Sequence, residues 1–159
     1  MSHEKMEKSL IIIKPDAIQR SLAGEIISRF ERKGLKIVGM KMLNASSTLL
    51  EEHYEHIADK PFFAGIKKFM MHSPVIAMAV EGIHAIDAIR IIVGPTKGYE
   101  ADAGSIRGDF TMSIQSNVVH ASDSVENGIS EVARFFKEDE LFSYPKITDV
   151  MVFADDLME

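Results

Sequence analysis

The stretch Leu10-Ile11-Ile12-Ile13-Lys14-Pro15-Asp16 decides the fold, because a run of branched apolar residues meets a proline there. A short apolar run without helical spacing predicts a buried β-strand over residues 10–13. Proline has no N–H to donate to a neighbouring strand, so we expect the strand to end before it. Lys14 is then placed at the end of a buried strand. Functional side chains often lie at such ends, which makes Lys14 a candidate site residue.

The hydrophobic pattern after this run predicts alternating helices and strands. Further strands are predicted over residues 35–43, 74–80 and 113–119. Residues 94–108 are predicted to form a long loop rich in glycine and polar residues. Helices are predicted over residues 23–33 and 84–93, after the capping residues Ser46-Ser47, from Pro61, and after Ser122-Asp123-Ser124.

This order, β-α-β-α(α)-β-α-β-α, predicts an α+β fold of the ferredoxin-like kind, a split βαβ sandwich. We expect a four-stranded antiparallel sheet covered by helices, with the helices on one face. The second and third strands are expected to lie antiparallel beside the first. Because no repeat or linker divides the chain, residues 1–159 are expected to form a single domain.

The composition excludes several classes of protein. The 159 residues are 46% hydrophobic and 26% charged, which is typical of a soluble globular protein rather than a membrane protein. The sequence has no cysteine, which excludes disulfide scaffolds and thiolate chemistry and fits a reducing compartment. A chain with a net charge of −6 lacks the overall positive field that attracts nucleic acid. Residues 1–8 are polar and unlike a signal peptide, so we expect a cytoplasmic location without membrane contact.

A phosphate ligand would need side-chain cations in this chain. The sequence contains neither a Walker run nor a Gly-x-Gly-x-x-Gly turn, which excludes a glycine-rich cradle. The candidate cations are Lys14 at a strand end, Arg90 late on a helix and Arg107 at the close of the long loop. Since the chain is net acidic, phosphate binding requires these three residues to converge in the fold.

His120 differs from the other five histidines in its position between a predicted strand and a predicted helix. A helix N-terminus attracts anions, and a neutral imidazole is a competent nucleophile for phosphoryl groups. Glu131 lies beside the apolar face of the following helix, where it could turn toward His120 and orient it. The alternative, left equally open by the local pattern, is a half-buried histidine before a capped helix. Metal binding by histidines is not indicated, because His53 and His56 have no third ligand in suitable spacing.

Five segments occur together in an order and spacing shared by one enzyme family. They are Leu10-Ile11-Ile12-Ile13-Lys14-Pro15-Asp16-Ala17, Gly24-Glu25-Ile26-Ile27, Lys60-Pro61-Phe62-Phe63, Ile106-Arg107-Gly108-Asp109-Phe110 and Asn117-Val118-Val119-His120-Ala121-Ser122-Asp123-Ser124. From residue 8 to residue 136 the chain resembles the nucleoside diphosphate kinases, and the segment around His120 is highly specific. Ala121 departs from the glycine that most members have there, and the C-terminal tail differs from that of many relatives.

The resemblance implies ping-pong transfer of a γ-phosphoryl group from a nucleoside triphosphate to a nucleoside diphosphate. It implies that His120 is the nucleophile, that Glu131 and Ser122 hold its ring, and that Lys14 and Tyr54 contact the transferring group. The residues that it implies for nucleotide binding are Lys14, Phe62, Arg90, Thr96, Arg107, Ile114 and Asn117.

The resemblance also implies partners and a cofactor. The partners are nucleoside tri- and diphosphates such as ATP and GTP, and Mg²⁺ is held mainly by their phosphates rather than by a protein site. A homo-oligomer is expected, with a hexamer favoured over a tetramer.

Two other classes of function remain to be weighed against the enzyme. A non-catalytic nucleotide-binding regulatory module of the same fold would be marked by loss of His120, Lys14 or Arg107, and all three are present. A nucleic-acid-binding domain of ferredoxin-like fold would need a basic face and aromatic residues on its strands. The net charge of −6 and the predicted strands, which lack aromatic residues, count against that reading.

Overall fold

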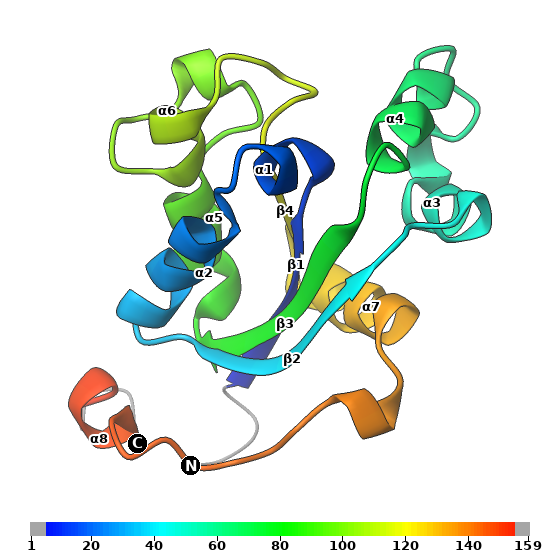
Figure 1. Cartoon of the computed structure of the whole chain (residues 1–159). Coiled ribbons are helices and arrows are strands. Elements are labelled where there is room, and N and C mark those ends of the chain that lie inside the picture. Colours follow the sequence, from blue (N-terminus) through cyan, green and yellow to red (C-terminus); the bar gives the residue numbers. More distant parts are fainter. Residues whose placement is uncertain (1–5, 155–159) are drawn as a thin grey trace.

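Strand β1 (Met6–Ile13) contains the apolar run and lies inside the sheet. The computed structural model describes residues 6–154. The other strands are β2 (Lys36–Leu43), β3 (Val75–Ile83) and β4 (Val119–Ala121). Every neighbouring pair is antiparallel, and the strand order is β2-β3-β1-β4. The predicted α+β fold with a four-stranded antiparallel sheet is confirmed (Figure 1).

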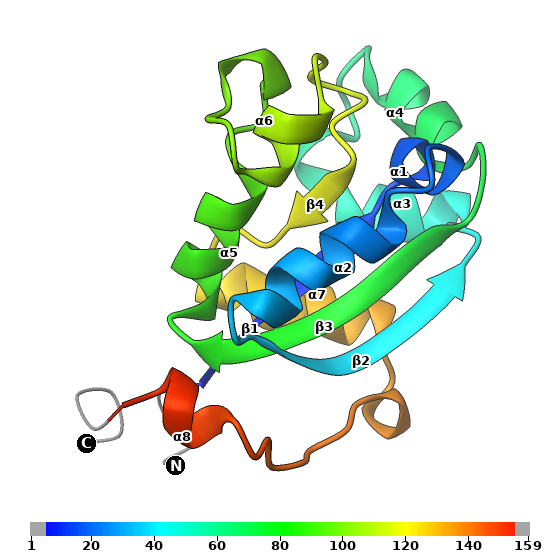
Figure 2. The ribbon, with the colours of Figure 1, turned by 60° about the vertical axis from the view of Figure 1, so that its left-hand side comes forward.

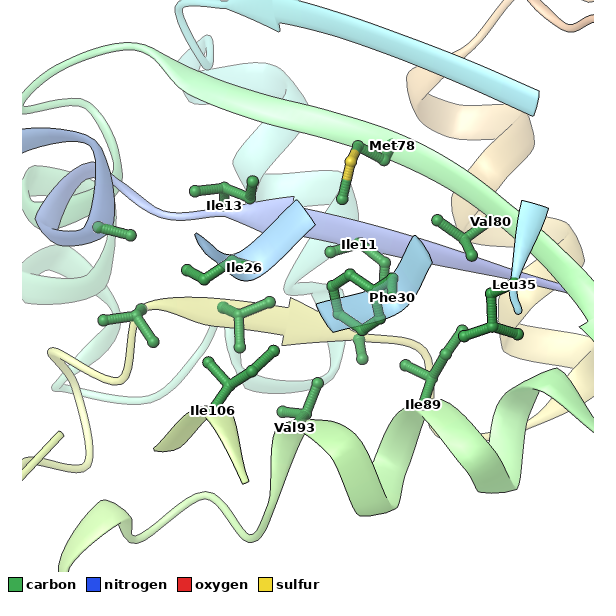
Figure 3. Packing of buried hydrophobic residues seen from close by; sticks show 14 of the residues in the cluster. Ile11, Ile13, Ile26, Phe30, Leu35, Met78, Val80, Ile89, Val93 and Ile106 are labelled. Carbon is green, nitrogen blue, oxygen red and sulfur yellow. The ribbon is translucent and has the colours of Figure 1, made fainter. Parts of the chain in front are cut away.

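The side chains of β1 alternate between two hydrophobic cores, one on each face of the sheet. Ile11 and Ile13 belong to the first core and Leu10 and Ile12 to the second, and all four are fully buried. The first core, shown in Figure 3, is covered by helices α2 (Ala23–Arg32) and α5 (Ala85–Val93). The second is covered by α3 (Ser47–His53), α4 (Phe63–Met70) and α7 (Val125–Phe135). The prediction of helices on one face was therefore wrong, because an apolar strand needs cover on both faces.

The second strand does not lie beside the first, contrary to the prediction. Strand β3 lies between them, with Met6 opposite Ile83 and Ile13 opposite Ile76. Strands β1 and β2 both run antiparallel to β3, so they are parallel to each other and are connected across the sheet by α2. Such a crossover leaves room for one strand between the two that it joins.

The fourth strand is shorter and later in the chain than predicted. It covers only Val119–Ala121, and the prediction of a strand over residues 113–119 was wrong. Val118 has a φ of +61°, which interrupts an extended strand, and the Ser116 N–H donates to the Ser113 hydroxyl in a local turn. His120 consequently lies within β4, opposite Ile12, and not between the strand and the helix.

Several short helices were not predicted from the sequence. Helix α1 (Pro15–Gln19) starts directly after Lys14, with proline at its first position. The other short helices are η2 (Glu55–Ile57), η3 (Gly98–Glu100), α6 (Ile106–Phe110), η4 (Glu138–Glu140) and α8 (Asp149–Val152). The tail passes the outer edge of β2, where the Phe142 N–H donates to the Val38 carbonyl (Figure 2). None of the helices in residues 6–154 is long and apolar enough to cross a membrane.

Helix α7 approaches β1 closely at Gly128, and this contact can be tested. A Cβ added at Gly128 would lie 2.1 Å from the Lys8 carbonyl oxygen. We expect Gly128→Ala to lower the free energy of unfolding by about 1–3 kcal/mol, because the helix must move away from the strand. The matched control is Gly65→Ala on α4, where nothing lies within 4 Å of the added Cβ. It should raise the free energy of unfolding by about 0.5–1 kcal/mol. Urea denaturation measures both, and equal effects would contradict the close approach.

Candidate active site

A cavity of about 570 Å³ lies at the end of β1 and gathers residues from both halves of the chain. It is lined by most of the predicted site residues. These are Lys14, Tyr54, Arg90, Thr96, Arg107, Asn117, His120 and Glu131. Lys14, Arg90 and Arg107 therefore lie together in the fold, as phosphate binding by a net-acidic chain requires. A hollow of about 640 Å³ between the start of β1 and α7 is larger, but it is mainly apolar and contains none of the predicted residues.

His120 is held by a carboxylate on one side of its ring. Its Nε2 lies 3.0 Å from Glu131 Oε2, and the Ser122 hydroxyl donates to the same oxygen over 2.5 Å. Burial raises the pKa of Glu131, but the hydrogen bonds from His120 and Ser122 outweigh it and hold the pKa below its ordinary value. The ionised carboxylate only accepts hydrogen bonds, so Nε2 carries the proton in this arrangement. Nδ1 then has the ring's lone pair, and it has no hydrogen bond within the described part of the chain.

Arg107 is a buried cation with no carboxylate partner among residues 6–154. Its side chain is fixed by three main-chain carbonyls, of Gly94, Asn117 and Val119, at 3.0, 3.3 and 2.6 Å. The residue is only 4% exposed, and no acidic oxygen within residues 6–154 forms an ion pair with it. Burial and the nearby Arg90 lower the pKa of Arg107 to about 10, so it stays charged at neutral pH. A buried unpaired charge is costly, which indicates that an anion completes this site.

Lys14 repeats this pattern next to Arg107. Its ammonium group donates to the Asn117 side-chain oxygen over 2.7 Å, and it likewise has no ion pair with any carboxylate of the described residues. Burial and the charge of Arg107 lower the pKa of Lys14 to about 8, against a smaller opposing effect of Asp16. The Asn117 amide also donates to the Thr96 carbonyl over 3.3 Å, which ties the long loop to this cluster.

Two aromatic side chains complete the wall behind His120. Burial, together with the charge of Glu131, raises the pKa of Tyr54 to about 12, so its phenol remains a hydrogen-bond donor. His53 is only 5% exposed, and its ring lies edge-on to the His120 ring with 4.7 Å between centroids. The Arg134 guanidinium donates to His53 Nδ1 over 3.3 Å. Burial and the neighbouring charges of His120 and Arg134 lower the pKa of His53 to about 3, so its ring is neutral.

Sequence reasoning missed His53 and Arg134 as parts of this site. A signal was present for His53, since it directly precedes Tyr54, which the resemblance implicated. Arg134 carries no local signal, because a single arginine on an amphipathic helix resembles any solvated charge.

His53, His120 and Glu131 offer ligand atoms that all lie within 4.8 Å of one another. Two imidazoles and one carboxylate are unsuited to Mg²⁺, which prefers oxygen ligands. The carboxylate already accepts from His120 and Ser122, and the nearby Arg134 repels a cation. The chemistry of this cluster therefore does not suit Mg²⁺.

Phe62 and Ile114 lie outside the cavity. They are 56% and 52% exposed, on the residue before α4 and on the loop after α6. The two segments approach each other where the Gln115 side chain donates to the Gly65 carbonyl over 3.3 Å. The structure thus brings the phosphate-binding candidates together but does not place these two apolar side chains in the cavity lining.

The fold and the site together define a class of protein. An imidazole oriented by a carboxylate, beside unpaired cations, suits attack on a phosphoryl group, since that transfer depends on positioning and charge neutralisation. These are the features of a phosphotransferase.

Comparison with known proteins gives the family. Residues 7–141 match the family described as nucleoside diphosphate kinase. A nucleoside diphosphate kinase of Parabacteroides distasonis is 49% identical over 95% of this chain and 99% of its own length. One of Staphylococcus haemolyticus is 50% identical over 93% of this chain and 99% of its own. A halophilic nucleoside diphosphate kinase of Halobacterium salinarum, solved in complex with CDP, superimposes with a TM-score of 0.90 at 38% identity, covering 93% and 99% of the two chains. The chain belongs to the nucleoside diphosphate kinase family.

The lowered pKa of Lys14 predicts a pH-dependent cost in stability. The pKa falls from 10.5 to about 8 on folding, so between these values the unfolded chain binds more protons than the folded one. Stability attributable to Lys14 therefore rises with pH across this window, and the full penalty is present below pH 8. We expect Lys14→Met to be more stable than wild type at pH 7 by about 1–2 kcal/mol, with the difference shrinking toward pH 10.

Urea denaturation at several pH values measures this difference. Lys68→Met, which replaces an exposed lysine on α4, controls for the loss of one positive charge. A Lys14→Met advantage that does not change between pH 7 and pH 10 would show that burial does not oppose the charge of Lys14.

Proposed function

We propose that this chain is a nucleoside diphosphate kinase that forms a phosphohistidine on His120. The observation that carries the proposal is the arrangement of His120, which lines the cavity with its Nε2 hydrogen-bonded to Glu131. This leaves Nδ1 as the nucleophilic nitrogen. The unpaired charges of Arg107 and Lys14 in the same cavity support a phosphate ligand there.

The first half-reaction moves the phosphoryl group onto the enzyme. The lone pair of His120 Nδ1 forms a bond to the γ-phosphorus of a nucleoside triphosphate. The bond from that phosphorus to the β,γ-bridging oxygen breaks, and the nucleoside diphosphate leaves with the electron pair. The ring gains positive charge as the bond forms, and the adjacent Glu131 carboxylate stabilises it. In the second half-reaction a terminal oxygen of another nucleoside diphosphate attacks the phosphohistidine, and Nδ1 leaves with its electron pair restored.

The cations and polar groups of the cavity are proposed to hold the nucleotide in line with Nδ1. Lys14, Tyr54 and Arg107 surround the transferring group, and Tyr54 can donate because its pKa is raised to about 12. Arg90 and Thr96 bind the inner phosphates. This set supplies the charge neutralisation on which phosphoryl transfer depends.

The sugar and the base are proposed to extend from the cavity. Asn117 binds the sugar hydroxyls together with Lys14. Phe62 stacks on the base with Ile114 on its far side, and their exposure leaves both available for a ligand. Stacking without a base-edge partner predicts tolerance of ATP, GTP and other nucleotides.

Mg²⁺ is proposed as the cofactor. The cavity lining also includes the carboxylates of Glu52, Glu55 and Asp123, whose oxygens suit this ion. The residues present therefore fit a magnesium held mainly by nucleotide phosphates. When bound, the ion neutralises phosphate charge.

We further propose that residues 1–159 form a single domain that assembles as a homo-oligomer, a hexamer in preference to a tetramer. The cysteine-free sequence fits a reducing compartment, and we propose the cytoplasm as the place of action.

Labelling with γ-³²P-ATP tests the proposed function. Wild-type protein with Mg²⁺ should acquire acid-labile phosphate and pass it to added nucleoside diphosphate. His120→Asn should lose the label and nearly all exchange activity, because the lone pair of an amide nitrogen is delocalised into the carbonyl group and is not nucleophilic. His72→Asn, an exposed histidine outside the cavity, is the matched control and should label normally. Full exchange by His120→Asn, or an unlabelled wild type, would contradict the proposal; the second result would favour a nucleotide-binding regulatory module.

Glu131→Gln tests how the ring is held. The amide keeps the size of the side chain but has no charge to stabilise the imidazolium that forms during transfer. We expect the rate of His120 phosphorylation to fall about 10²-fold or more, measured in a single turnover with radiolabelled ATP. Glu126→Gln, an exposed change on the same helix, should leave the rate unchanged. A Glu131→Gln rate within about threefold of wild type would remove this carboxylate from the mechanism.

A further inference from the structure

Val118 has an unusual backbone conformation next to the site. Its φ of +61° lies in the left-handed region, which β-branched residues rarely adopt and which costs about 1–3 kcal/mol. The side chain is nevertheless fully buried in the first core, with Ile106 among its cluster. The surroundings must therefore impose this conformation on Val118.

Both main-chain groups of Val118 are bound by the segment that follows β1. The Val118 N–H donates to Asp16 Oδ2 over 3.1 Å, and the Val118 carbonyl accepts from the Lys14 N–H over 2.9 Å. The segment from Lys14 to Asp16, with Pro15 between them, thus holds the peptide groups on both sides of Val118. Asp16 Oδ1 is buried and has no hydrogen-bond partner within residues 6–154, so the carboxylate is kept there at a cost.

The neighbours of Val118 carry the parts of the site. The Asn117 side chain accepts from the Lys14 ammonium group over 2.7 Å. The Asn117 and Val119 carbonyls both accept from the Arg107 guanidinium. Val119 also starts β4, in which the next residue is His120. A change in the Val118 dihedral angles would therefore move the contacts of two cations and the position of the nucleophile together.

We propose that Asp16 is a positioning residue for phosphoryl transfer: its carboxylate holds Val118 in the left-handed conformation and so keeps Lys14, Arg107 and His120 in register. The inference deepens the proposed function and rests on it. Asp16 acts through Val118 and through a hydrogen bond rather than through its charge. Glycine adopts a positive φ without strain, so a glycine at position 118 should need Asp16 less.

A different role for Asp16 would be to balance the charge of Lys14. The charge of Asp16 does raise the pKa of Lys14, although burial and Arg107 outweigh it. The two roles differ in what Asp16→Asn does. An asparagine oxygen can still accept from the Val118 N–H but carries no charge. Asp16→Ala removes both the acceptor and the charge.

The test compares four variants in single-turnover phosphorylation of His120 by Mg-ATP and in steady-state exchange. Asp16→Ala should lower kcat about 10–100-fold with KM changed much less, because displaced groups weaken the transition state more than binding. Asp16→Asn should stay within about fivefold of wild type. Val118→Gly should remain active, and adding Asp16→Ala to it should lower kcat no more than about threefold further.

Hydrogen exchange at the Val118 amide gives a second readout that does not depend on the glycine variant folding well. The amide should be protected in wild type and in Asp16→Asn and exchange much faster in Asp16→Ala. A wild-type rate in Asp16→Ala would overturn the proposal. Equal losses in Asp16→Asn and Asp16→Ala, without rescue by Val118→Gly, would assign Asp16 to charge balance instead.

Failure of the proposed kinase function can be distinguished from failure of the role proposed for Asp16. If wild-type protein takes up no phosphate, the kinase assignment fails whatever the variants do. The hydrogen-exchange comparison then still decides whether Asp16 holds Val118, and an unchanged amide in Asp16→Ala would overturn that part as well.

Discussion

Strand β1 cannot shift along its neighbours, and the geometry of the site depends on this constraint. Ile11 and Ile13 fill one core while Leu10 and Ile12 fill the other, so a slip by one residue would exchange every side chain between the two cores. The fixed register sets Lys14 at the strand end. It also sets His120, which lies opposite Ile12. The same packing that stabilises the fold therefore aligns a cation and a nucleophile from segments more than a hundred residues apart.

The charges of the site work against stability. Arg107 is buried on three carbonyl oxygens, and Lys14 is held on an amide oxygen with its pKa lowered to about 8. Neither has an ion pair with a carboxylate in residues 6–154, although the chain as a whole carries a charge of −6. Protein interiors disfavour such unpaired cations, and an anionic ligand relieves the cost. The whole-chain charge thus says little about the cavity, where Lys14, Arg90 and Arg107 lie together.

The first three strands and the long helices could be predicted from the sequence because their signals are local. The apolar run of β1, the alternation of β2 and the caps of α7 each lie within a few residues of the element that they define. The errors arose where contacts between segments distant in the sequence determine the local structure. The short β4 and its preceding turn depend on Asp16, a hundred residues earlier, and the cover of both sheet faces depends on the crossover of α2. The residues alone indicated Lys14, Arg90, Arg107, His120 and Glu131, and the family resemblance supplied the other site residues. His53 and Arg134 became visible as parts of the site only in the folded chain, where they line the cavity with His120. The role of Asp16 became visible only from its contact with Val118.

The surroundings of His53 and His120, the two neighbouring imidazoles of the site, give the two rings different chemical properties. The Arg134 guanidinium donates to His53 Nδ1, and burial above all, with the charges of His120 and Arg134, lowers the pKa of His53 to about 3. It stays neutral at physiological pH and cannot compete for a proton or for the phosphoryl group through that nitrogen. His120 is instead hydrogen-bonded to the ionised carboxylate of Glu131, which can stabilise the positive charge that develops on the ring during transfer. Charge created by attack on phosphorus is therefore stabilised on His120 alone. The neutral ring of His53 packs edge-on beside the His120 ring and restricts its rotation. It does so without adding a further positive charge to a cavity that already contains several cations.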